Sequence, residues 1–328
     1  MTKLYLHIGP HKTGSTFIQK VFFENRERVL RLGVNYPNFG FSGQFGQHEA
    51  VEKVRTLEQH QLDEYLAQFL GGEINFASSE NFDRLNSGEI RKLKQSLASA
   101  DVRIVYYYRN HVDMLPSWWQ EAVKHGSRVS FHEFVLPHIL RPFASNIVNP
   151  CVVLDLYADV FGKDNITIID YNAALQRDTI LAPLLELLGI ELSGIINASV
   201  NASLKPEIVE IIRALNAIGE SNGQLKFHNI RTLFLRKRNS DEIRGEVERL
   251  AAAIRSQMKP LRLSGGFFEH SVITAFRKKY EACFFNDLRD QLPDRELLVP
   301  SDTWMLTGRA VAACERIYQH VVSGDVSY

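Results

Sequence analysis

The sequence is poor in the residues that mark several classes of protein. It has only three cysteines, Cys151, Cys283 and Cys314, and none stands at CxxC or metal-ligand spacing from another. This argues against a structural zinc site and against a disulfide framework. No apolar run reaches the roughly 18 residues of a membrane span, and the first residues lack the basic start and apolar core of a secretory signal. We therefore expect a cytoplasmic protein with reduced cysteines and no membrane anchor.

The sequence also lacks an excess of charge of either sign. Lysine plus arginine number 38, aspartate plus glutamate number 38, and the formal net charge is zero. A general nucleic-acid-binding protein needs a basic excess, so no nucleic-acid partner is expected, although a local basic site is compatible with this balance. Hydrophobic residues at 45% and charged residues at 23% are ordinary for a globular protein. A chain of 328 residues suffices for one large α/β domain.

Strand-like and helical patterns alternate over the first two hundred residues. Apolar runs predict strands at 4–8, 74–78, 102–108 and 165–170, with helical periodicity at 57–70, 87–97, 111–125, 154–161 and 179–188. This alternation predicts an α/β fold with a parallel β-sheet flanked by helices, and the β-branched, aromatic run 102–108 is expected to be its central strand.

From residue 205 onward the patterns are almost entirely helical. They cover 206–218, 241–258, 270–290 and 307–322. No clear linker separates these helices from the preceding part of the chain. We therefore predict a single domain over residues 1–328, with an α/β core at 1–200 and a mainly helical C-terminal annex at 201–328.

A glycine-containing loop follows the first predicted strand and opens the first helix. Backbone N–H groups at the start of a helix attract anions, and a lysine and three hydroxyl side chains lie in the same short segment. A tight turn with a solvent-facing lysine is the alternative, but it does not explain this concentration of anion-binding groups. The segment predicts a phosphate or sulfate site formed by Gly9, His11, Lys12, Thr13, Gly14, Ser15 and Thr16.

The spacing of the two glycines also fits the Walker A loop of ATP- and GTP-binding proteins. In that loop a lysine follows the second glycine, whereas here Ser15 follows Gly14 and the lysine is at position 12. The strand-end aspartate that helps to hold magnesium has only Asp170 as a weak candidate. ATP chemistry is therefore disfavoured and no metal is expected, but a P-loop kinase or NTPase stays as the alternative enzyme.

Two segments carry a family resemblance. HIGPHKTGST resembles the 5′-phosphosulfate-binding loop of sulfotransferases that use 3′-phosphoadenosine-5′-phosphosulfate (PAPS), particularly carbohydrate sulfotransferases with a KTGT or KTGS core. YYYRNHVDMLPSWWQEAVKHG resembles the family's 3′-phosphate-binding segment, in which a serine follows a strand-end arginine by eight positions, as Ser117 follows Arg109. LYADVFGKDNITIIDYN is a weaker match, and the resemblance covers residues 3–190. It implies a P-loop-NTPase-like sulfotransferase fold, with PAPS as donor and 3′-phosphoadenosine 5′-phosphate (PAP) as product.

Arg109 and Ser117 are also chemically suited to bind a phosphate, independently of the resemblance. An arginine fork can bind two phosphate oxygens and a serine hydroxyl a third. Taken singly, Arg109 is equally a strand-end salt-bridge residue and Ser117 a helix-face residue. In-line sulfuryl transfer further needs charge stabilisation on the leaving oxygen, a role that suits Lys12, and a base for the acceptor.

Four residues are candidates for that base, because the family uses either histidine or glutamate. His48 follows the glycine-rich residues 36–47 and is the favoured candidate. Glu80 follows the second strand, at the edge where parallel sheets bind their ligands. Glu24 has charged neighbours that indicate a solvated helix end, and Glu49 is the fourth. The resemblance itself does not choose among these four residues.

The sequence leaves alternatives for the identity of the acceptor and for the role of the later basic residues. Lys205 and the basic residues 226–238 either close over the nucleotide, bind an anionic acceptor, or form a solvated helix face. The resemblance predicts transfer to a hydroxyl or amine of a glycan, a glycolipid or another small hydroxylated acceptor. A catalytically inactive scaffold that binds nucleotide or glycan is the alternative from a different class, and the oligomeric state is not predicted.

Overall fold

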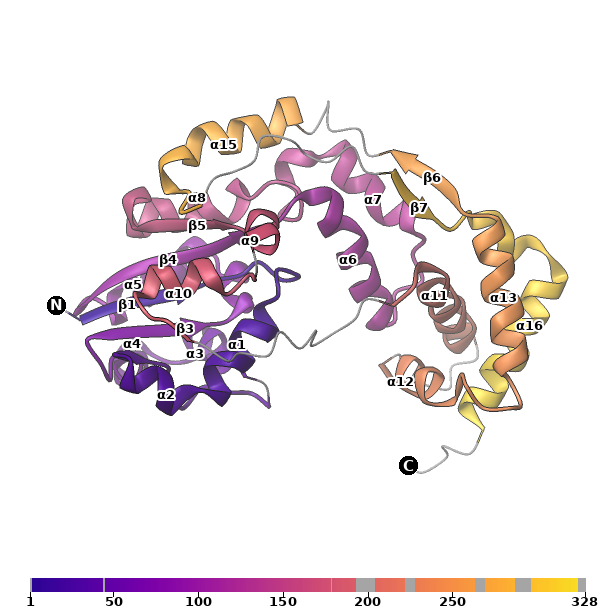
Figure 1. Ribbon diagram of the computed structural model, residues 1–328, viewed down its shortest axis with the longest axis horizontal. Helices are drawn as coiled ribbons and strands as arrows, with labels where there is room; N and C mark the ends of the chain where they lie inside the picture. The colour runs from indigo at the N-terminus through magenta and orange to yellow at the C-terminus, as the bar shows by residue number, and fades with distance from the viewer. Residues whose placement is uncertain are drawn as a thin grey trace. The chain divides into compact units, whose positions relative to one another are not determined.

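The protein is represented by a computed structural model, which forms two compact units (Figure 1). The structure describes residues 2–43, 45–177, 179–192, 204–221, 228–262, 269–286 and 296–323. The sheet unit comprises Met1–His111, Phe143–Asn201 and Glu269–Leu292, and the helical unit comprises Val112–Pro142, Ala202–Phe268 and Pro293–Tyr328. These units divide the chain at other places than the predicted core and annex, because residues 112–142 pack with the later helices and 269–286 pack with the sheet.

The sheet unit contains a five-stranded parallel sheet in the order β2-β3-β1-β4-β5. Its strands are β1 (Thr2–His7), β2 (Val34–Asn35), β3 (Ile74–Ser78), β4 (Ala100–Tyr108) and β5 (Ile166–Asp170). The predicted α/β class with a parallel sheet flanked by helices is confirmed. The expected central strand was wrong: β1 is central, because β3 and β4 pair with its two opposite edges.

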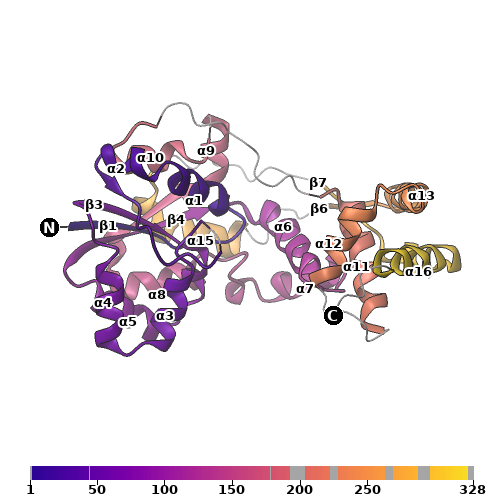
Figure 2. The same ribbon diagram turned by 90° about the horizontal axis from the view of Figure 1, so that it is seen from below.

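Helices cover both faces of this sheet, as Figure 2 shows. One face carries α1, α2 and α10, and the other carries α3, α4, α5 and α8. Strand residues alternate accordingly: Leu4 and Leu6 of β1 belong to one apolar cluster and Tyr5 to the other. The helices of this unit are α1 (Ser15–Glu24), α2 (Arg26–Arg31), α3 (Glu49–Thr56), α4 (Gln59–Ala67), α5 (Ser87–Ser96), α8 (Cys151–Phe161), α9 (Tyr171–Arg177), α10 (Ala182–Leu188) and α15 (Thr274–Tyr280).

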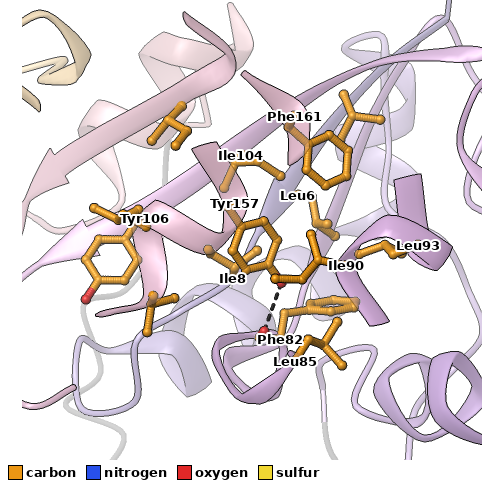
Figure 3. Packing of buried hydrophobic residues seen from close by; sticks show 14 of the residues in the cluster. Leu6, Ile8, Phe82, Leu85, Ile90, Leu93, Ile104, Tyr106, Tyr157 and Phe161 are labelled. Carbon is orange, nitrogen blue, oxygen red and sulfur yellow. Dashed lines mark hydrogen bonds between the residues drawn. The ribbon is translucent and has the colours of Figure 1, made fainter. Parts of the chain in front are cut away.

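One of the two clusters anchors the turn that follows β3. Figure 3 shows Tyr157 of α8 among apolar side chains from the sheet and from α5. Its hydroxyl donates to the backbone oxygen of Phe82 at 2.8 Å. A buried hydroxyl needs such a partner, since desolvating it alone is costly. Phe82 lies in the 3₁₀ turn Glu80–Arg84, so this bond fixes the turn that carries Glu80 to the core.

The chain returns to the sheet unit near its C-terminus. After a π-helical turn at Glu269–Ile273, α15 places Phe276 and Tyr280 in the same cluster, and a 3₁₀ turn follows at Glu281–Cys283. Phe284 then forms a parallel bridge with Ile168 of β5. The predicted helix at 270–290 is therefore correct only for part of its length, and its residues 287–290 lie outside the described ranges.

The helical unit contains most of the later helices and one small antiparallel pair of strands. Its elements are α6 (His111–Lys124), whose first residue belongs to the sheet unit, α7 (Phe131–Leu140), α11 (Pro206–Ser221), α12 (His228–Lys237), α13 (Arg244–Ser256), α16 (Gly308–Val322), β6 (Lys259–Arg262), β7 (Glu296–Val299) and the 3₁₀ turn Asp302–Leu306. In its interior, the Arg213 Nε donates to Glu210 at 2.9 Å, and Trp304 Nε1 donates to the same carboxylate at 2.9 Å. A helical C-terminal region is thus present, and the strand pair was not predicted.

Two further expectations concern the helices. Within the ranges given above, no helix has both the length and the apolar character needed to cross a membrane.

Of the basic residues 226–238, the structure describes those from 228 onward, and Lys226 lies outside them. Lys237 Nζ donates to the backbone oxygens of Val321 and Ser323 at 3.0 and 2.7 Å. This lysine therefore caps the end of α16, where backbone carbonyls have no helical partner.

Candidate active site

The loop between β1 and α1 has a tightly curled backbone. Gly9 and Gly14 have φ of 107° and 77°, and Lys12 has φ of 70°, which a residue with a side chain rarely adopts. A Cβ atom on Gly14 would lie 2.2 Å from Cδ1 of Ile180. Both its backbone conformation and its surroundings therefore require glycine at position 14.

This curl leaves the first amides of α1 without an acceptor in the helix. The helix begins at Ser15 with Gly14 at the N-cap, and no side chain caps it. The first helical hydrogen bonds run from Phe17 and Ile18 to the Gly14 oxygen, at 3.0 and 3.1 Å. The amides of Ser15 and Thr16 precede them and have no acceptor within the helix. Together with the helix dipole they form an anion-binding end.

Thr13 has a role inside the loop. It is fully buried, and its hydroxyl donates to the backbone oxygen of Pro10 at 2.7 Å. Its side chain therefore closes the curl, while an anion would be bound by the uncapped amides of the helix start. The predicted loop residues thus divide into those that shape the loop and those that face an anion.

Arg109, the first residue after β4, lies against this loop. Its Nη1 donates to the backbone oxygen of Lys12, and its guanidinium carbon lies 4.9 Å from the ring centroid of Tyr171. Its Nε is buried and, among the residues that the structure describes, has no hydrogen-bond partner. A buried donor without a partner is costly. The fork therefore has free donor capacity that fits a phosphate group.

Ser117 was predicted as the partner of Arg109. It lies on α6 in the helical unit, where its hydroxyl donates to the backbone oxygen of Asp113 at 3.0 Å. Trp119 of the same helix is 2% exposed and donates from Nε1 to the Val129 oxygen, so its ring packs inside the helical unit.

A buried polar cluster lies at the C-terminal end of β3, beside the loop. Gln19 of α1 donates from Nε2 to Oε2 of Glu80 at 2.7 Å and to the Ser78 hydroxyl at 3.2 Å. His48 Nδ1 lies 2.8 Å from the Ser79 hydroxyl. The structure thus brings both favoured base candidates to one place. Gln19 was missed, although its spacing of four from Ser15 puts it on the same helix face.

Glu80 directly adjoins the anion-binding loop. A Cβ atom on Gly9 would lie 3.2 Å from the Glu80 Cα. On the loop itself, His11 Nδ1 lies 3.9 Å from the other carboxylate oxygen of Glu80, Oε1. The carboxylate therefore has one oxygen held by Gln19 and the other facing the loop.

The protonation states of the two candidates differ. Burial lowers the pKa of His48 below its ordinary value, against the opposing charge of Glu80. For Glu80 burial opposes ionisation, but the charge of His48 and the hydrogen bond from Gln19 outweigh it, and the pKa is lowered. At neutral pH the cluster therefore holds a carboxylate and a neutral imidazole.

The other two base candidates are surface residues. Glu24 pairs with Lys20 at 3.7 Å and its side chain is 55% exposed. Glu49 pairs with Lys53 at 3.1 Å and is 40% exposed. Both pairs join residues four apart on one helix, the ordinary arrangement of a solvated helix face. Neither residue belongs to the polar cluster.

Acid should destabilise the protein through His7. This residue is fully buried, its Nδ1 lies 2.8 Å from the Ser78 hydroxyl, and burial lowers its pKa to about 4. Its folded pKa lies below the unfolded one, so the stabilisation is present at neutral pH and is lost as the pH falls from about 6.5 toward 4. We expect His7 alone to account for a loss of about 3 kcal/mol over this interval.

Urea unfolding at a series of pH values tests this expectation. His7→Gln keeps a side chain that can bond to Ser78 but cannot titrate, so its unfolding free energy should fall less steeply than that of the wild type. Equal slopes below pH 6.5 for the two proteins would contradict the assignment to His7. Burial also lowers the pKa of His11 to about 4. His11 should therefore account for part of the pH dependence of the unfolding free energy that remains in the variant.

The fold and loop define a class of protein: a parallel α/β protein with an anion-binding loop after its first strand. The family model described as "Sulfotransferase domain" matches residues 5–203. The chain therefore belongs to the sulfotransferase family and is a PAPS-dependent sulfotransferase. A solved structure, a sulfotransferase from Alicyclobacillus acidocaldarius, is similar with 16% identity and a TM-score of 0.39, over 69% of this chain and 97% of that chain. No curated protein matches the sequence significantly.

Proposed function

We propose that the loop at residues 9–16 binds the 5′-phosphosulfate of PAPS and that Arg109 binds its 3′-phosphate. The observation that carries this proposal is the contact of the Arg109 fork with the Lys12 backbone, which leaves a buried Nε donor beside an anion-binding loop. A donor with two anionic groups needs two such sites at a fixed separation. Ser117 is proposed as a second ligand of the 3′-phosphate on its sequence spacing alone.

Lys12 is proposed to stabilise the charge that develops on the leaving phosphate. It carries a full positive charge within the loop, and its own left-handed backbone is a conformation that costs free energy. Such strain persists where the surrounding structure enforces it, often at functional sites. The uncapped amides of Ser15 and Thr16 would share the same anion.

For the base we propose Glu80 ahead of His48. The Nδ1 atom of His48 is engaged with the Ser79 hydroxyl at 2.8 Å, whereas Glu80 has one oxygen that faces the loop. The Glu80 carboxylate is ionised, Gln19 orients one of its oxygens, and the other faces the loop. His48 then supports Ser79, the residue that caps the turn carrying Glu80, without touching the acceptor.

The acceptor is proposed to be a hydroxyl, or an amine, of a carbohydrate or glycolipid. The support for this is the KTGS core of the loop, which resembles carbohydrate sulfotransferases. Fold does not determine the acceptor, because acceptor pockets are formed by variable loops. Transfer of labelled sulfate from PAPS to a library of glycans, glycolipids and small alcohols identifies the class, and transfer only to the alcohols would overturn the carbohydrate proposal.

Lys12→Ala tests the proposed donor site. We expect sulfuryl transfer to fall about 10²- to 10³-fold, because a charge aimed at the leaving group is lost, while PAP still binds within about tenfold of wild type. Lys12→Gly should show the same catalytic loss. Its free energy of unfolding should be about 1 kcal/mol higher than that of Lys12→Ala, because glycine tolerates the positive φ. Rapid-quench turnover, calorimetric PAP binding and urea unfolding measure the three quantities.

Lys20→Ala is the matched control, because Lys20 lies on α1 in a surface pair with Glu24. It should leave turnover and PAP binding unchanged. Two results would favour the other readings of the loop. Tight magnesium-dependent ATP binding that is indifferent to Arg109→Ala indicates a P-loop kinase or NTPase. PAP binding without turnover on any acceptor, or without hydrolysis of PAPS, indicates an inactive scaffold.

A further inference from the structure

A segment beyond the sulfotransferase-domain match completes the sheet unit next to Arg109. The family model ends at residue 203, whereas residues 284–286 lie along the outer edge of β5. The Phe285 amide donates to the Ile168 oxygen at 2.9 Å. The edge of the sheet is thus closed by a part of the chain that the family domain does not include.

Asn286 ends this segment with a two-point contact to the last residue of β5. Its Oδ1 accepts from the Asp170 amide at 2.7 Å, and its Nδ2 donates to the Asp170 oxygen at 3.1 Å. The asparagine is 6% exposed, so both bonds are shielded from water. A side-chain amide that satisfies both backbone groups of one residue fixes that residue as an added strand would.

Asp170 passes this constraint to α9. Its carboxylate accepts from the Ala173 amide at 2.8 Å and from the Asn172 amide, which holds the first turn of the helix. The two residues that follow Asp170 both reach the segment after β4. The Tyr171 ring lies against the Arg109 guanidinium, and Asn172 Oδ1 accepts from the Asn110 amide at 3.1 Å.

We infer that Asn286 and Tyr171 are positioning residues that aim the Arg109 fork, and that they thereby set the preference for a 3′-phosphorylated nucleotide. The inference rests on the proposed role of Arg109 at the 3′-phosphate. Three features fix the direction of the Arg109 guanidinium: its own aliphatic stem, the hydrogen bond from Nη1 to the Lys12 oxygen, and the contact with the Tyr171 ring. Only with that direction fixed does the Nε edge present two parallel donors to a phosphate.

The test is the ratio of the Kd for AMP to the Kd for PAP, measured by calorimetry. These nucleotides differ only in the 3′-phosphate, so contacts to the adenine and the 5′-phosphate cancel. Tyr171→Leu should lower the ratio about tenfold through loss of the aromatic face. Tyr171→Phe keeps the face and should keep the ratio within about twofold. Asn286→Ala should lower it about three- to tenfold.

Asn75→Ala is the matched control for Asn286. Asn75 is also a buried asparagine, and its Nδ2 donates to the backbone oxygens of Gly72 and Lys3 at 2.8 and 3.2 Å. It lies near the start of β3, at the opposite end of the strands from the loop. This variant should lose similar stability in thermal unfolding and keep the wild-type ratio, which separates aiming of Arg109 from general destabilisation.

Arg109→Ala distinguishes failure of the inference from failure of the proposed function. If Arg109→Ala leaves the ratio at its wild-type value, Arg109 does not bind the 3′-phosphate and both are wrong. If Arg109→Ala collapses the ratio but Tyr171→Leu and Asn286→Ala do not lower it, the donor site stands and the positioning inference is overturned. Should Asn286→Ala not fold, the two Tyr171 variants decide the outcome.

Discussion

Glu80→Gln is expected to lower the turnover number about 10²- to 10⁴-fold while the Kd for PAP stays within about threefold of wild type. The substitution removes the basic oxygen but keeps the shape of the side chain and an acceptor for Gln19, which lies 2.7 Å from Oε2. The effect therefore reports proton transfer and not the collapse of the polar cluster. Single-turnover transfer from labelled PAPS, with calorimetric PAP binding, measures both quantities.

Two comparisons make this result decisive. Glu49→Gln removes a carboxylate from an exposed pair on α3 and should leave turnover unchanged. His48→Ala should lower turnover much less than Glu80→Gln, because the imidazole contacts Ser79 at the start of the turn and is not itself the base in this proposal. If His48→Ala abolishes turnover and Glu80→Gln retains it, His48 is the base, as the sequence alone favoured.

The pH dependence of kcat/KM should agree with this assignment. Because the pKa of Glu80 is lowered from its ordinary value of 4.5, the carboxylate stays ionised down to acidic pH. The acid limb of the profile should therefore lie below pH 4.5, with no loss between pH 7 and about 5.5 from this group. A limb near pH 6 that disappears in His48→Ala would instead indicate an imidazole base.

Gly14→Ala is expected to destabilise the protein by about 2–5 kcal/mol and to abolish measurable PAP binding. The alanine is forced into a left-handed conformation at φ of 77°, which costs about 1–2 kcal/mol. Its methyl group would also lie 2.2 Å from the buried Cδ1 of Ile180, and such overpacking costs about 1–3 kcal/mol. Relief by backbone movement would rotate the amides of Ser15 and Thr16 away from the anion.

The two contributions can be separated within this chain. Gly189 has φ of 69° and nothing within 4 Å of an added Cβ, so Gly189→Ala carries the conformational cost alone. Ile180→Val removes the clashing methyl group, and in combination with Gly14→Ala it should restore part of both stability and PAP binding. Urea unfolding of the four proteins in this double-mutant cycle gives the coupling energy. Additive losses would show that Ile180 does not restrict position 14.

Local patterns in the sequence predicted the sheet well. The strands β1, β3, β4 and β5 each lie within two residues of their predicted ranges, because buried parallel strands are continuous apolar runs. The two-residue strand β2 and the pair β6–β7 were missed. The residues of β2 pair with residues of β3 that lie 40 positions later, and β6 pairs with β7 across more than 30 positions. Short-range periodicity contains no information on such distant contacts.

The sequence patterns also did not predict that residues 269–286 belong to the sheet unit. The stretch was predicted as one helix of the annex, and its helical part was correct. That its last residues lie along β5 depends on an unpaired sheet edge formed by a strand more than 100 residues earlier. Helical periodicity describes which face of a segment is apolar and not which partner covers it.

The sequence by itself located the loop at residues 9–16 and predicted its anion-binding role and the donor. The glycines, Lys12 and the helix start are neighbours along the chain, so their arrangement follows from local backbone rules. Only the tertiary structure showed which side chains lie around that loop. Gln19, His48 and Glu80 come from three elements that meet at the end of β3, and Arg109 is held by Tyr171 and the loop together. Such groups are brought within bonding distance by packing of the sheet and its helices, which no short stretch of sequence encodes.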